Sequence, residues 1–331
     1  MKKKLISVAL PCRNEEENIE ELVRQIKDQF EKFLPQYDYE IQFMDNQSTD
    51  KTREILRGLC AQDKHIKAIF NVKSFSGSAF HGILQTKGDC CIYMASDFQD
   101  PPEMIPQFVK EWEQGYKIVC GIKESSSENK LMWWMRSLYY KLIQMNSSIK
   151  QIEHFTGFAL YDRDFIEIMR SLQDTTPTLR GLVAEYGYKV KKISFHQPKR
   201  KKGKSSQNFF SLFDYAMRNF TTYTKTGLHL ATLGGALIAG VSVVIGCVYL
   251  VLKLIFWDNF SAGMAPLLIG MFFLGAVQIF FIGLVGEYVM SVNARVMKKP
   301  YAIEEERLNF DEAVKPEHVE YYHPSERKEK E

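Results

Sequence analysis

Short apolar runs alternate with longer segments of helical period through the first 122 residues. The runs of strand length are Leu5–Leu10, Tyr39–Met44, Ile66–Val72, Cys90–Ala95 and Lys117–Ile122. The helical segments between them are Glu15–Phe33, Asp50–Cys60, Gly77–Lys87 and Pro102–Gln114. This alternation predicts an α/β fold, in which a mainly parallel sheet has helices on both faces. Because ligands bind at the carboxyl ends of the strands in such sheets, the segments that follow the strands are the first candidates for a functional site.

Beyond Ile122 the pattern is less regular. It predicts a helix over "NKLMWWMRSLYYKLIQM", a strand over "FTGFALYD", a helix after Asp164, another helix over Thr178–Tyr186 and a strand over "KVKKISF". The basic stretch "PKRKKGKSS" comes next. Residues 208–226 are rich in Phe and Tyr and include two basic residues, which is typical of an amphipathic helix at a membrane surface.

Two later segments contain no charged residue over the length of a membrane span. They are Ala231–Leu252 and Phe260–Gly286, and each is long enough as a helix to cross about 30 Å of hydrocarbon. A pair of buried core helices is disfavoured, because such long uncharged runs need protein on every side. The sequence therefore predicts two transmembrane helices. The expected divisions are a soluble domain at 1–204, a surface helix at 205–227, spans at 228–257 and 260–290, and a tail at 291–331.

The charges that flank these spans predict their orientation. Basic residues gather before the first span and after the second: Lys191, Lys192, Lys199, Arg200, Lys201, Lys202, Lys204, Lys225, Arg295, Lys298 and Lys299. The loop between the spans, "WDNFSAGMAP", carries only Asp258. Since basic residues concentrate on the cytoplasmic side, we expect a multi-pass protein of the inner (plasma) membrane, with its soluble domain and both termini in the cytoplasm.

Composition narrows the functional classes only slightly. The 331 residues are 45% apolar, enough for a full core, and the net charge of +3 gives no general attraction to nucleic acid. The six cysteines form no CxxC pair and no cluster with zinc spacing, so we expect reduced thiols in the core. No GxGxxG follows the first predicted strand and no GxxxxGK precedes Ser or Thr, which disfavours a dinucleotide-binding dehydrogenase and a P-loop ATPase.

Six motifs then occur in a definite order. They are "VALPCRNEEENI", "FMDNQSTDKT", "SDFQDPPEMIPQFVKEWEQGYKIVCGIK", "TGFALYDRDF", "KGKSS" and, after the two spans, "GEYVMSVNARVMKKPY". In this order and spacing the chain resembles, over nearly its whole length, the membrane-anchored family-2 glycosyltransferases of the bactoprenol (undecaprenyl-phosphate) glucosyltransferase and dolichol-phosphate mannosyltransferase group. The resemblance implies a GT-A fold, which is Rossmann-like, a nucleotide-sugar donor, a divalent cation and direct displacement with inversion at the anomeric carbon.

The resemblance assigns the metal to Asp97 and Gln99, which follow the fourth predicted strand. A hard cation such as Mg²⁺ or Mn²⁺, held by one or two oxygen side chains, would neutralise the charge that builds on a departing diphosphate. Asp97 is therefore an expected catalytic residue. Asp100 has a simpler interpretation, because Asp-Pro-Pro-Glu is typical of an N-cap followed by a helix that starts with Pro.

The chain departs from the family pattern at two positions. Ala95 stands where relatives usually have the first Asp of an Asp-x-Asp pair, so we expect weaker cation binding or an altered cation preference. Asn46 follows Asp45 where relatives often have an acid that meets the base of the nucleotide. We expect Asp45 and Asn46 to bind the nucleotide sugar, since Asn offers both a donor and an acceptor to a base edge. The alternative is that Asn46 and Ser48 only turn the chain and cap the next helix.

The segment after the first strand adds further expected contacts. By resemblance, Pro11, Arg13 and Glu15 line the nucleotide-sugar pocket. Asn14 is expected to cap the following helix. For Glu15, a solvated acid in the first helical turn is an open alternative.

The acceptor side requires positive charge, because a polyprenyl phosphate carries close to two negative charges at neutral pH. Its own oxygen can attack without a strong general base. Arg136 and Arg163 match basic positions of the family, and we expect them to hold the acceptor phosphate, with Arg136 also catalytic. For Arg163, an ion pair with Asp162 or Asp164 is an open alternative. Arg200, Lys202 and Lys204 either close over the donor diphosphate or only mark the cytoplasmic flank of the first span.

The sequence thus predicts an inverting hexosyltransferase that moves a sugar from a nucleotide donor, UDP-linked by expectation, to undecaprenyl phosphate at the inner leaflet. Its product would be a lipid-linked sugar for the modification of surface polymers. The alternative is a catalytically impaired scaffold at the membrane that still binds a nucleotide sugar, motivated by Ala95 and Asn46. A basic module that binds nucleic acid through "KRKKGK" is a third, less supported reading. Self-association is possible, because small residues in the spans allow close helix packing.

Overall fold

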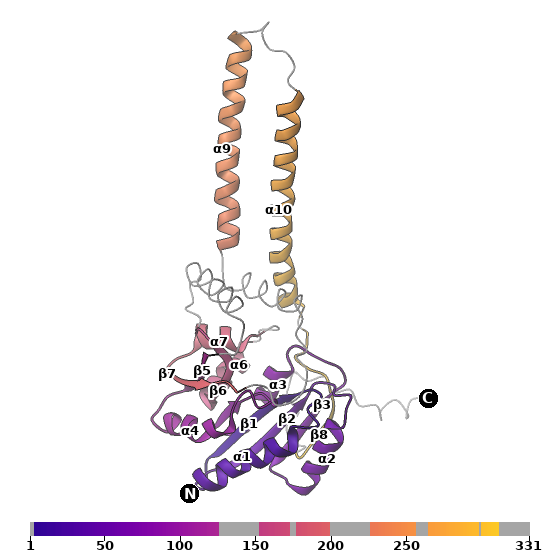
Figure 1. The fold of residues 1–331 in the computed structure, drawn as a ribbon, viewed down its shortest axis with the longest axis vertical. Helices are drawn as coiled ribbons and strands as arrows, with labels where there is room; N and C mark the ends of the chain where they lie inside the picture. Colours follow the sequence, from indigo (N-terminus) through magenta and orange to yellow (C-terminus); the bar gives the residue numbers. More distant parts are fainter. Residues whose placement is uncertain are drawn as a thin grey trace, which may run out of the picture. The chain divides into compact units, whose positions relative to one another are not determined.

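The computed structural model describes residues 3–125, 152–172, 177–198, 226–255, 264–297 and 299–310. The chain divides into two compact units (Figure 1). The first unit holds residues 1–137, 150–206 and 297–331, and the second holds residues 138–149 and 207–296. We describe each unit by itself.

The first unit is built on one eight-stranded sheet with the strand order β7-β5-β6-β4-β1-β2-β3-β8. The strands are β1 (Leu5–Cys12), β2 (Asp38–Asp45), β3 (Ile66–Asn71), β4 (Cys90–Tyr93), β5 (Ile118–Ser125), β6 (Phe155–Asp162), β7 (Val190–His196) and β8 (Glu304–Leu308). The four central strands β3, β2, β1 and β4 are parallel to one another. By contrast, β6 is antiparallel to β4 and β5, and β8 is antiparallel to β3.

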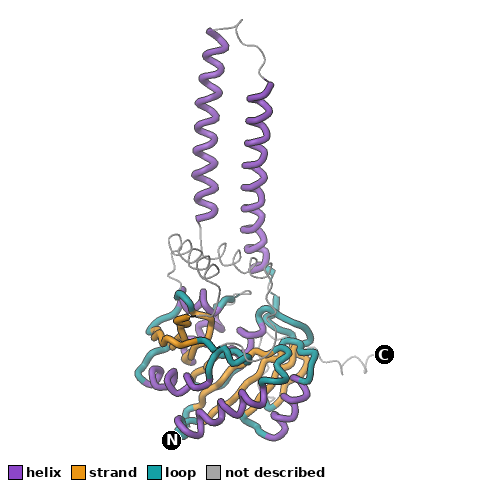
Figure 2. Tube along the Cα trace, in the orientation of Figure 1, coloured by secondary structure: helices purple, strands orange, loops and turns teal. Residues whose placement is uncertain are grey.

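Helices cover both faces of this sheet, as Figure 2 shows. They are α1 (Ile19–Phe33), α2 (Thr52–Gln62), α3 (Ser78–Gln85), the 3-10 helix η1 (Pro102–Met104), α4 (Ile105–Glu113), α6 (Arg163–Ser171) and α7 (Leu179–Tyr186). One core cluster joins α1, α2 and α4 to one face, and a second joins α3, α6 and α7 to the other. On α1 the buried residues Ile19, Leu22, Val23, Ile26 and Phe30 recur at helical spacing, which explains why this segment packs as a helix. The predicted α/β layering is confirmed.

Five of the six cysteines lie buried in the core of this unit as free thiols: Cys12, Cys60, Cys90, Cys91 and Cys120. Burial raises the pKa of the Cys91 and Cys120 thiols to about 12. Thiols with such high pKa values are poor nucleophiles, because the thiolate is the reactive form. These cysteines therefore pack as small apolar residues, as predicted from the sequence.

The edge strand β8 comes from the end of the chain that the sequence placed in a tail. It pairs with β3 in the register Ala68↔Leu308 and Phe70↔Glu306. Its first residue, Glu304, is 1% exposed and lies 2.5 Å from Nε2 of His81 on α3. Arg307 also donates to Glu304, at 2.6 Å from Nη2 to Oε1. The segment after the second unit is therefore a structural part of the first.

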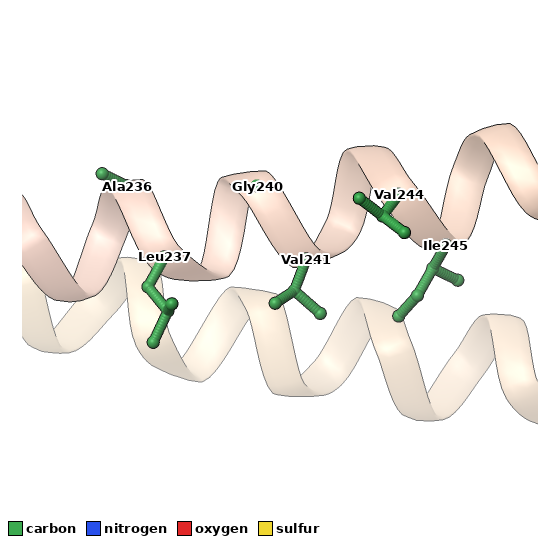
Figure 3. A pocket seen from close by; sticks show the side chains of 6 residues that line it. All are labelled: Ala236, Leu237, Gly240, Val241, Val244 and Ile245. Carbon is green, nitrogen blue, oxygen red and sulfur yellow. The ribbon is translucent and has the colours of Figure 1, made fainter.

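The described part of the second unit consists of two long helices, α9 (Thr226–Ile255) and α10 (Met264–Val296). Both expose many large apolar side chains, among them Leu237 and Val244 on α9 and Phe273 and Ile282 on α10. A groove of about 410 Å³ along α9 is lined by Ala236, Leu237, Gly240, Val241, Val244 and Ile245 (Figure 3).

Within the described residues, one stretch, Phe273–Ala294, is long and apolar enough to cross a membrane. Over the described residues both predicted segments are helical, and the crossing of a membrane by either helix stays a prediction.

Candidate active site

The carboxyl ends of four parallel strands meet at one edge of the sheet. The register places Cys12 of β1 beside Asp45 of β2, and Asp45 beside Phe70 of β3, while Ala9 of β1 lies beside Tyr93 of β4. The loops that follow these strands therefore lie next to one another. Hydrogen bonds tie two of these loops to the end of β1: Ser96 Oγ, in the loop after β4, donates to the carbonyl of Pro11 at 2.9 Å, and the backbone N–H of Asn46, after β2, donates to the carbonyl of Cys12 at 2.9 Å.

The loop after β4 turns back on itself around two buried carboxylates. Asp97 and Asp100 are each 5% exposed. The backbone N–H of Gln99 donates to Asp97 Oδ1 at 3.1 Å, and the N–H of Ala95 donates to Asp100 Oδ2 at 2.9 Å. The N-cap predicted for Asp100 is wrong, because Pro101 occupies the position before η1 and the Asp100 side chain closes the loop onto Ala95 instead.

These two carboxylates influence each other. Burial raises the pKa of Asp100 to about 7, the N–H of Ala95 and the Lys123 ammonium act against this rise, and the charge of Asp97 adds to it. Two acidic groups in one buried loop are electrostatically unfavourable without a cation. A divalent cation at Asp97 would relieve this repulsion.

The side chains of this loop fit a cation that also takes ligands from its substrate. Asp97 and the half-buried Gln99 supply oxygen atoms, whereas Ala95 supplies none from its methyl side chain. Among the described residues, no group of three or more His, Cys, Asp or Glu side chains could hold a metal ion. Mg²⁺ commonly binds through one or two protein oxygens together with substrate phosphates and water, and the residues present match that pattern.

Asp45, at the end of β2, is turned inward. It is fully buried, and its two carboxylate oxygens accept from the backbone N–H of Ser48 at 3.1 Å (Oδ1) and 3.3 Å (Oδ2). Its Oδ2 also accepts from Arg53 Nε at 2.6 Å. Protein groups enclose the Asp45 carboxylate, and the expected contact of Asp45 with the nucleotide stays a prediction. Its observed role is to shape the turn at 45–48.

Asn46 uses its side chain to hold the loop after β3. Its Nδ2 donates to Ser74 Oγ at 3.2 Å and to the carbonyl of Phe75 at 3.1 Å, and its Oδ1 accepts from the N–H of Phe75 at 2.8 Å. Both hydrogens of the amide are engaged. These contacts go to the loop after β3 and are not the helix cap of the alternative, and the expected contact of Asn46 with the nucleotide stays a prediction. Ser48 has a different role from a helix cap, because its hydroxyl accepts from the N–H of Asn14 at 2.9 Å.

Near the end of β1, Pro11 is half-buried, and in the loop that follows β1 the exposed Arg13 approaches Ser74 Oγ at 3.5 Å. Glu15 accepts a hydrogen bond from Asn18 Nδ2 at 2.6 Å. The predicted cap by Asn14 is wrong: α1 begins at Ile19, and Asn14 Oδ1 instead accepts from the backbone N–H of Thr49 at 2.8 Å. The structure thus brings Pro11 and Arg13 to the same edge as Asp97, and their contact with a nucleotide stays a prediction.

Arg163 lies at the opposite edge of the sheet. It follows β6, whose last residue, Asp162, pairs with Cys90 at the start of β4. The Arg163 guanidinium donates to the carbonyls of Gly88 at 2.8 Å and Thr86 at 2.9 Å. Asp162 and Asp164 are bound by Lys117 instead. These contacts give Arg163 a structural role, and the alternative of an ion pair with Asp162 or Asp164 is wrong. The expected contact of Arg163 with an acceptor phosphate stays a prediction.

Replacing Arg163 with Met is expected to lower the free energy of unfolding by about 1–3 kcal/mol, because buried carbonyl groups lose their donors. The Michaelis constant for a lipid phosphate acceptor should not change. The free energy of unfolding and the Michaelis constant are both measured on the purified protein in detergent. Arg170→Met, on the same helix and nearly half exposed, is the matched control. A raised Michaelis constant for the acceptor in Arg163→Met, with an unchanged free energy of unfolding, would contradict the structural role.

Arg136, Arg200, Lys202 and Lys204 lie outside the described residues. Their expected roles stay predictions. Sequence reasoning missed Arg53, which joins Asp45 to two other strands. Its position in the interior of a predicted helix gave no signal of this role.

The chain is similar to known proteins over most of its length. Residues 7–169 match the family described as "Glycosyl transferase family 2". The prophage bactoprenol glucosyl transferase homolog of Escherichia coli strain K12 is 28% identical over 89% of this chain and 96% of its own. The bactoprenol glucosyl transferase of Shigella phage SfX is 27% identical over 89% of this chain and 97% of its own.

A solved structure of glucosyl-3-phosphoglycerate synthase from Mycobacterium tuberculosis, in complex with Mn²⁺, UDP-glucose and phosphoglyceric acid, has a TM-score of 0.46 and 18% identity to this chain. It covers 66% of this chain and 78% of its own.

Proposed function

We propose that this chain transfers a hexose from a UDP-hexose to undecaprenyl phosphate at the inner leaflet of the plasma membrane. The premise is that the chain belongs to glycosyl transferase family 2 through its domain at residues 7–169 and is a glycosyltransferase. The bactoprenol glucosyl transferases that match over nearly their whole length support the acceptor. The observation that carries the proposal is the largely buried loop at 95–100, which contains Asp97 and Gln99 and is tied to the end of β1 by the hydrogen bond from Ser96 to Pro11.

In this proposal, Asp97 and Gln99 are the residues that would hold Mg²⁺ or Mn²⁺. The cation supplies charge neutralisation for the leaving group. Asp97 offers a carboxylate oxygen, Gln99 offers a neutral amide oxygen, and the hydrogen bond from the N–H of Ala95 to Asp100 fixes the loop that carries both. Preorganised groups of this kind lower the barrier because they need little rearrangement during the reaction.

The chemical step is a direct displacement. An oxygen of the lipid phosphate attacks the anomeric carbon, the bond to the donor diphosphate breaks, and UDP leaves with inversion of configuration. The phosphate oxygen is already ionised near neutral pH, so no strong general base is required. We assign Arg136 to hold this phosphate, and Arg200, Lys202 and Lys204 to the donor diphosphate, on the basis of the family pattern.

Strand β8 supports a two-span topology. It follows α10 in the chain and yet pairs with β3, which precedes α9. Strands of one sheet lie on the same side of a membrane, so the chain between them crosses an even number of times. With Phe273–Ala294 as one span, α9 is the natural second crossing. The basic flanks support a cytoplasmic position for both ends.

The rival function is a membrane-bound scaffold that binds a nucleotide sugar without turning it over. Ala95 supports it, because one potential metal ligand is missing. The buried Asp97 and Asp100 loop favours the enzyme, since a carboxylate retained in a buried, repulsive arrangement is typical of functional sites.

A transfer assay separates the two. Purified full-length protein in detergent receives undecaprenyl phosphate and each of a panel of radiolabelled UDP-sugars, with Mg²⁺, with Mn²⁺ or with chelator. We expect metal-dependent transfer of label into the organic phase from one UDP-hexose, and none without the lipid. UDP binding without transfer from any donor would support the scaffold, and absence of UDP binding would contradict both.

A further inference from the structure

Arg53 joins the ends of three strands through one guanidinium. Its Nε donates to Asp45 at the end of β2 at 2.6 Å, and its Nη2 donates to the carbonyl of Asn71 at the end of β3 at 2.6 Å. Its Nη1 donates to Glu305 on β8 at 2.9 Å. A planar guanidinium with donors in fixed directions can serve three partners at once, which an ammonium on a flexible stem does less well.

The partners of Arg53 control two of the loops at the proposed donor site. Asp45 holds the turn at 45–48 through the N–H of Ser48. That turn carries Asn46, which binds the backbone of Phe75 in the loop after β3. The same loop begins just after Asn71, whose carbonyl Arg53 also binds. Displacement of Arg53 would therefore loosen both loops together.

We propose that Arg53 is a positioning residue for the donor nucleotide, holding the loops after β2 and β3 in place through Asp45 and Asn71 while β8 anchors it through Glu305. This inference rests on the proposed function, since it assigns the base end of a UDP-sugar to those loops. It makes a strand that follows the membrane helices a support of the donor site.

Arg57 provides a matched control within the same helix. It lies one turn after Arg53 on α2, its Nη2 forms an ion pair with Glu306 on β8 at 2.7 Å, and it packs over Phe70 as Arg53 does. Its guanidinium binds Glu306 rather than Asp45. Replacing either arginine removes one cation and one ion pair to β8, and only the Arg53 replacement removes the link to β2.

The first experiment compares Arg53→Gln with Arg57→Gln in full-length protein, using the UDP-sugar that the wild type transfers. Arg53→Gln is expected to raise the Michaelis constant for the donor about tenfold or more, with kcat within roughly threefold of the wild type. The Michaelis constant of Arg53→Lys for the donor should lie between those of the wild type and Arg53→Gln, because Lys keeps the positive charge and loses the planar set of guanidinium donors. For Arg57→Gln, the Michaelis constant for the donor and kcat should both stay within about twofold of the wild-type values. Equal effects of the two Gln variants would overturn the proposal.

Arg53→Gln leaves the buried Asp45 carboxylate without its cation and can reduce folding. A double-mutant cycle with Asp45→Asn avoids this, because the neutral amide still accepts the N–H of Ser48. We expect Arg53→Gln to raise the Michaelis constant for the donor by a smaller factor in the Asp45→Asn background than in the wild type, because only the link to the carbonyl of Asn71 remains to be lost. An equal factor in the two backgrounds would overturn the proposal, since Arg53 would then act independently of Asp45.

Direct binding of UDP and of uridine, measured by calorimetry, tests which part of the donor is affected. If Arg53 positions the loops around the base, Arg53→Gln weakens both ligands by a similar factor. A loss confined to UDP would overturn the proposal, because it would place Arg53 at the diphosphate. Absence of UDP binding by the wild type would instead contradict the proposed donor, so the two failures are distinguishable.

Discussion

Replacement of Asp97 with Asn is expected to lower metal-dependent sugar transfer by roughly a thousandfold. Asp97 supplies the carboxylate among the two proposed metal ligands, and Ala95 offers no oxygen to replace it. A bound cation contributes several kcal/mol to the stabilisation of a departing phosphate, and each 1.4 kcal/mol corresponds to about a tenfold change in rate. The measurement is the initial rate of label transfer into the organic phase across a titration of Mg²⁺ and Mn²⁺.

Asp100→Asn is the matched control for this variant. Asp100 lies in the same loop, has the same 5% exposure and undergoes the same chemical change. An Asn oxygen can still accept the N–H of Ala95. Burial and the neighbouring Asp97 already raise the pKa of Asp100 to about 7, so a neutral side chain is well tolerated there. We expect Asp100→Asn to keep most of the activity. Equal losses in the two variants would assign Asp97 to the stability of the loop rather than to the cation.

The layering of the first unit could be predicted from the sequence because apolar periods are visible in single segments. The strand and helix alternation up to Ile122 matches β1 to β5 and the helices between them. Strand β8 could not be predicted in this way. Its sequence, "EEERL", has four charged residues and no apolar alternation. It becomes a strand only because β3 offers an unpaired edge and because Glu304 finds two cationic or polar partners in the fold.

The candidate site shows the same division between local and tertiary information. The position of Asp97 at the end of a strand follows from its motif, and the structure places it at the expected edge of the sheet. The N-cap predicted for Asp100 was wrong, because a local capping pattern cannot show that the Asp100 carboxylate accepts a hydrogen bond from the N–H of Ala95 instead. Arg163 matched a family pattern, but antiparallel pairing of β6 with β4 carries it to the opposite edge. Arg53 gains its role only from three partners that are distant in sequence.

Replacement of Glu304 with Ala is expected to lower the free energy of unfolding of the first unit by about 3–5 kcal/mol, because it removes one partner of a buried ionic cluster. Glu304 is 1% exposed and accepts from Arg307 and from His81, which is itself buried. Glu306→Ala, on the same strand with its side chain 35% exposed and paired to Arg57, should cost less than about 1 kcal/mol. Thermal and urea unfolding in detergent, with the two variants side by side, measure the difference.

The pH dependence of stability provides an independent check on this cluster. Burial by itself would raise the pKa of Glu304, but hydrogen bonds and charge from Arg307 and His81 outweigh it, so the pKa lies below the ordinary 4.5. A lowered pKa in the folded state means that the unfolded state binds the proton more tightly. The contribution of Glu304 is therefore complete above about pH 4.5 and is lost as the pH falls through its folded-state pKa. Glu304→Gln should flatten the acid limb of the stability curve. An acid limb as steep as in the wild type would show that Glu304 does not hold β8 to the sheet as an ionised group.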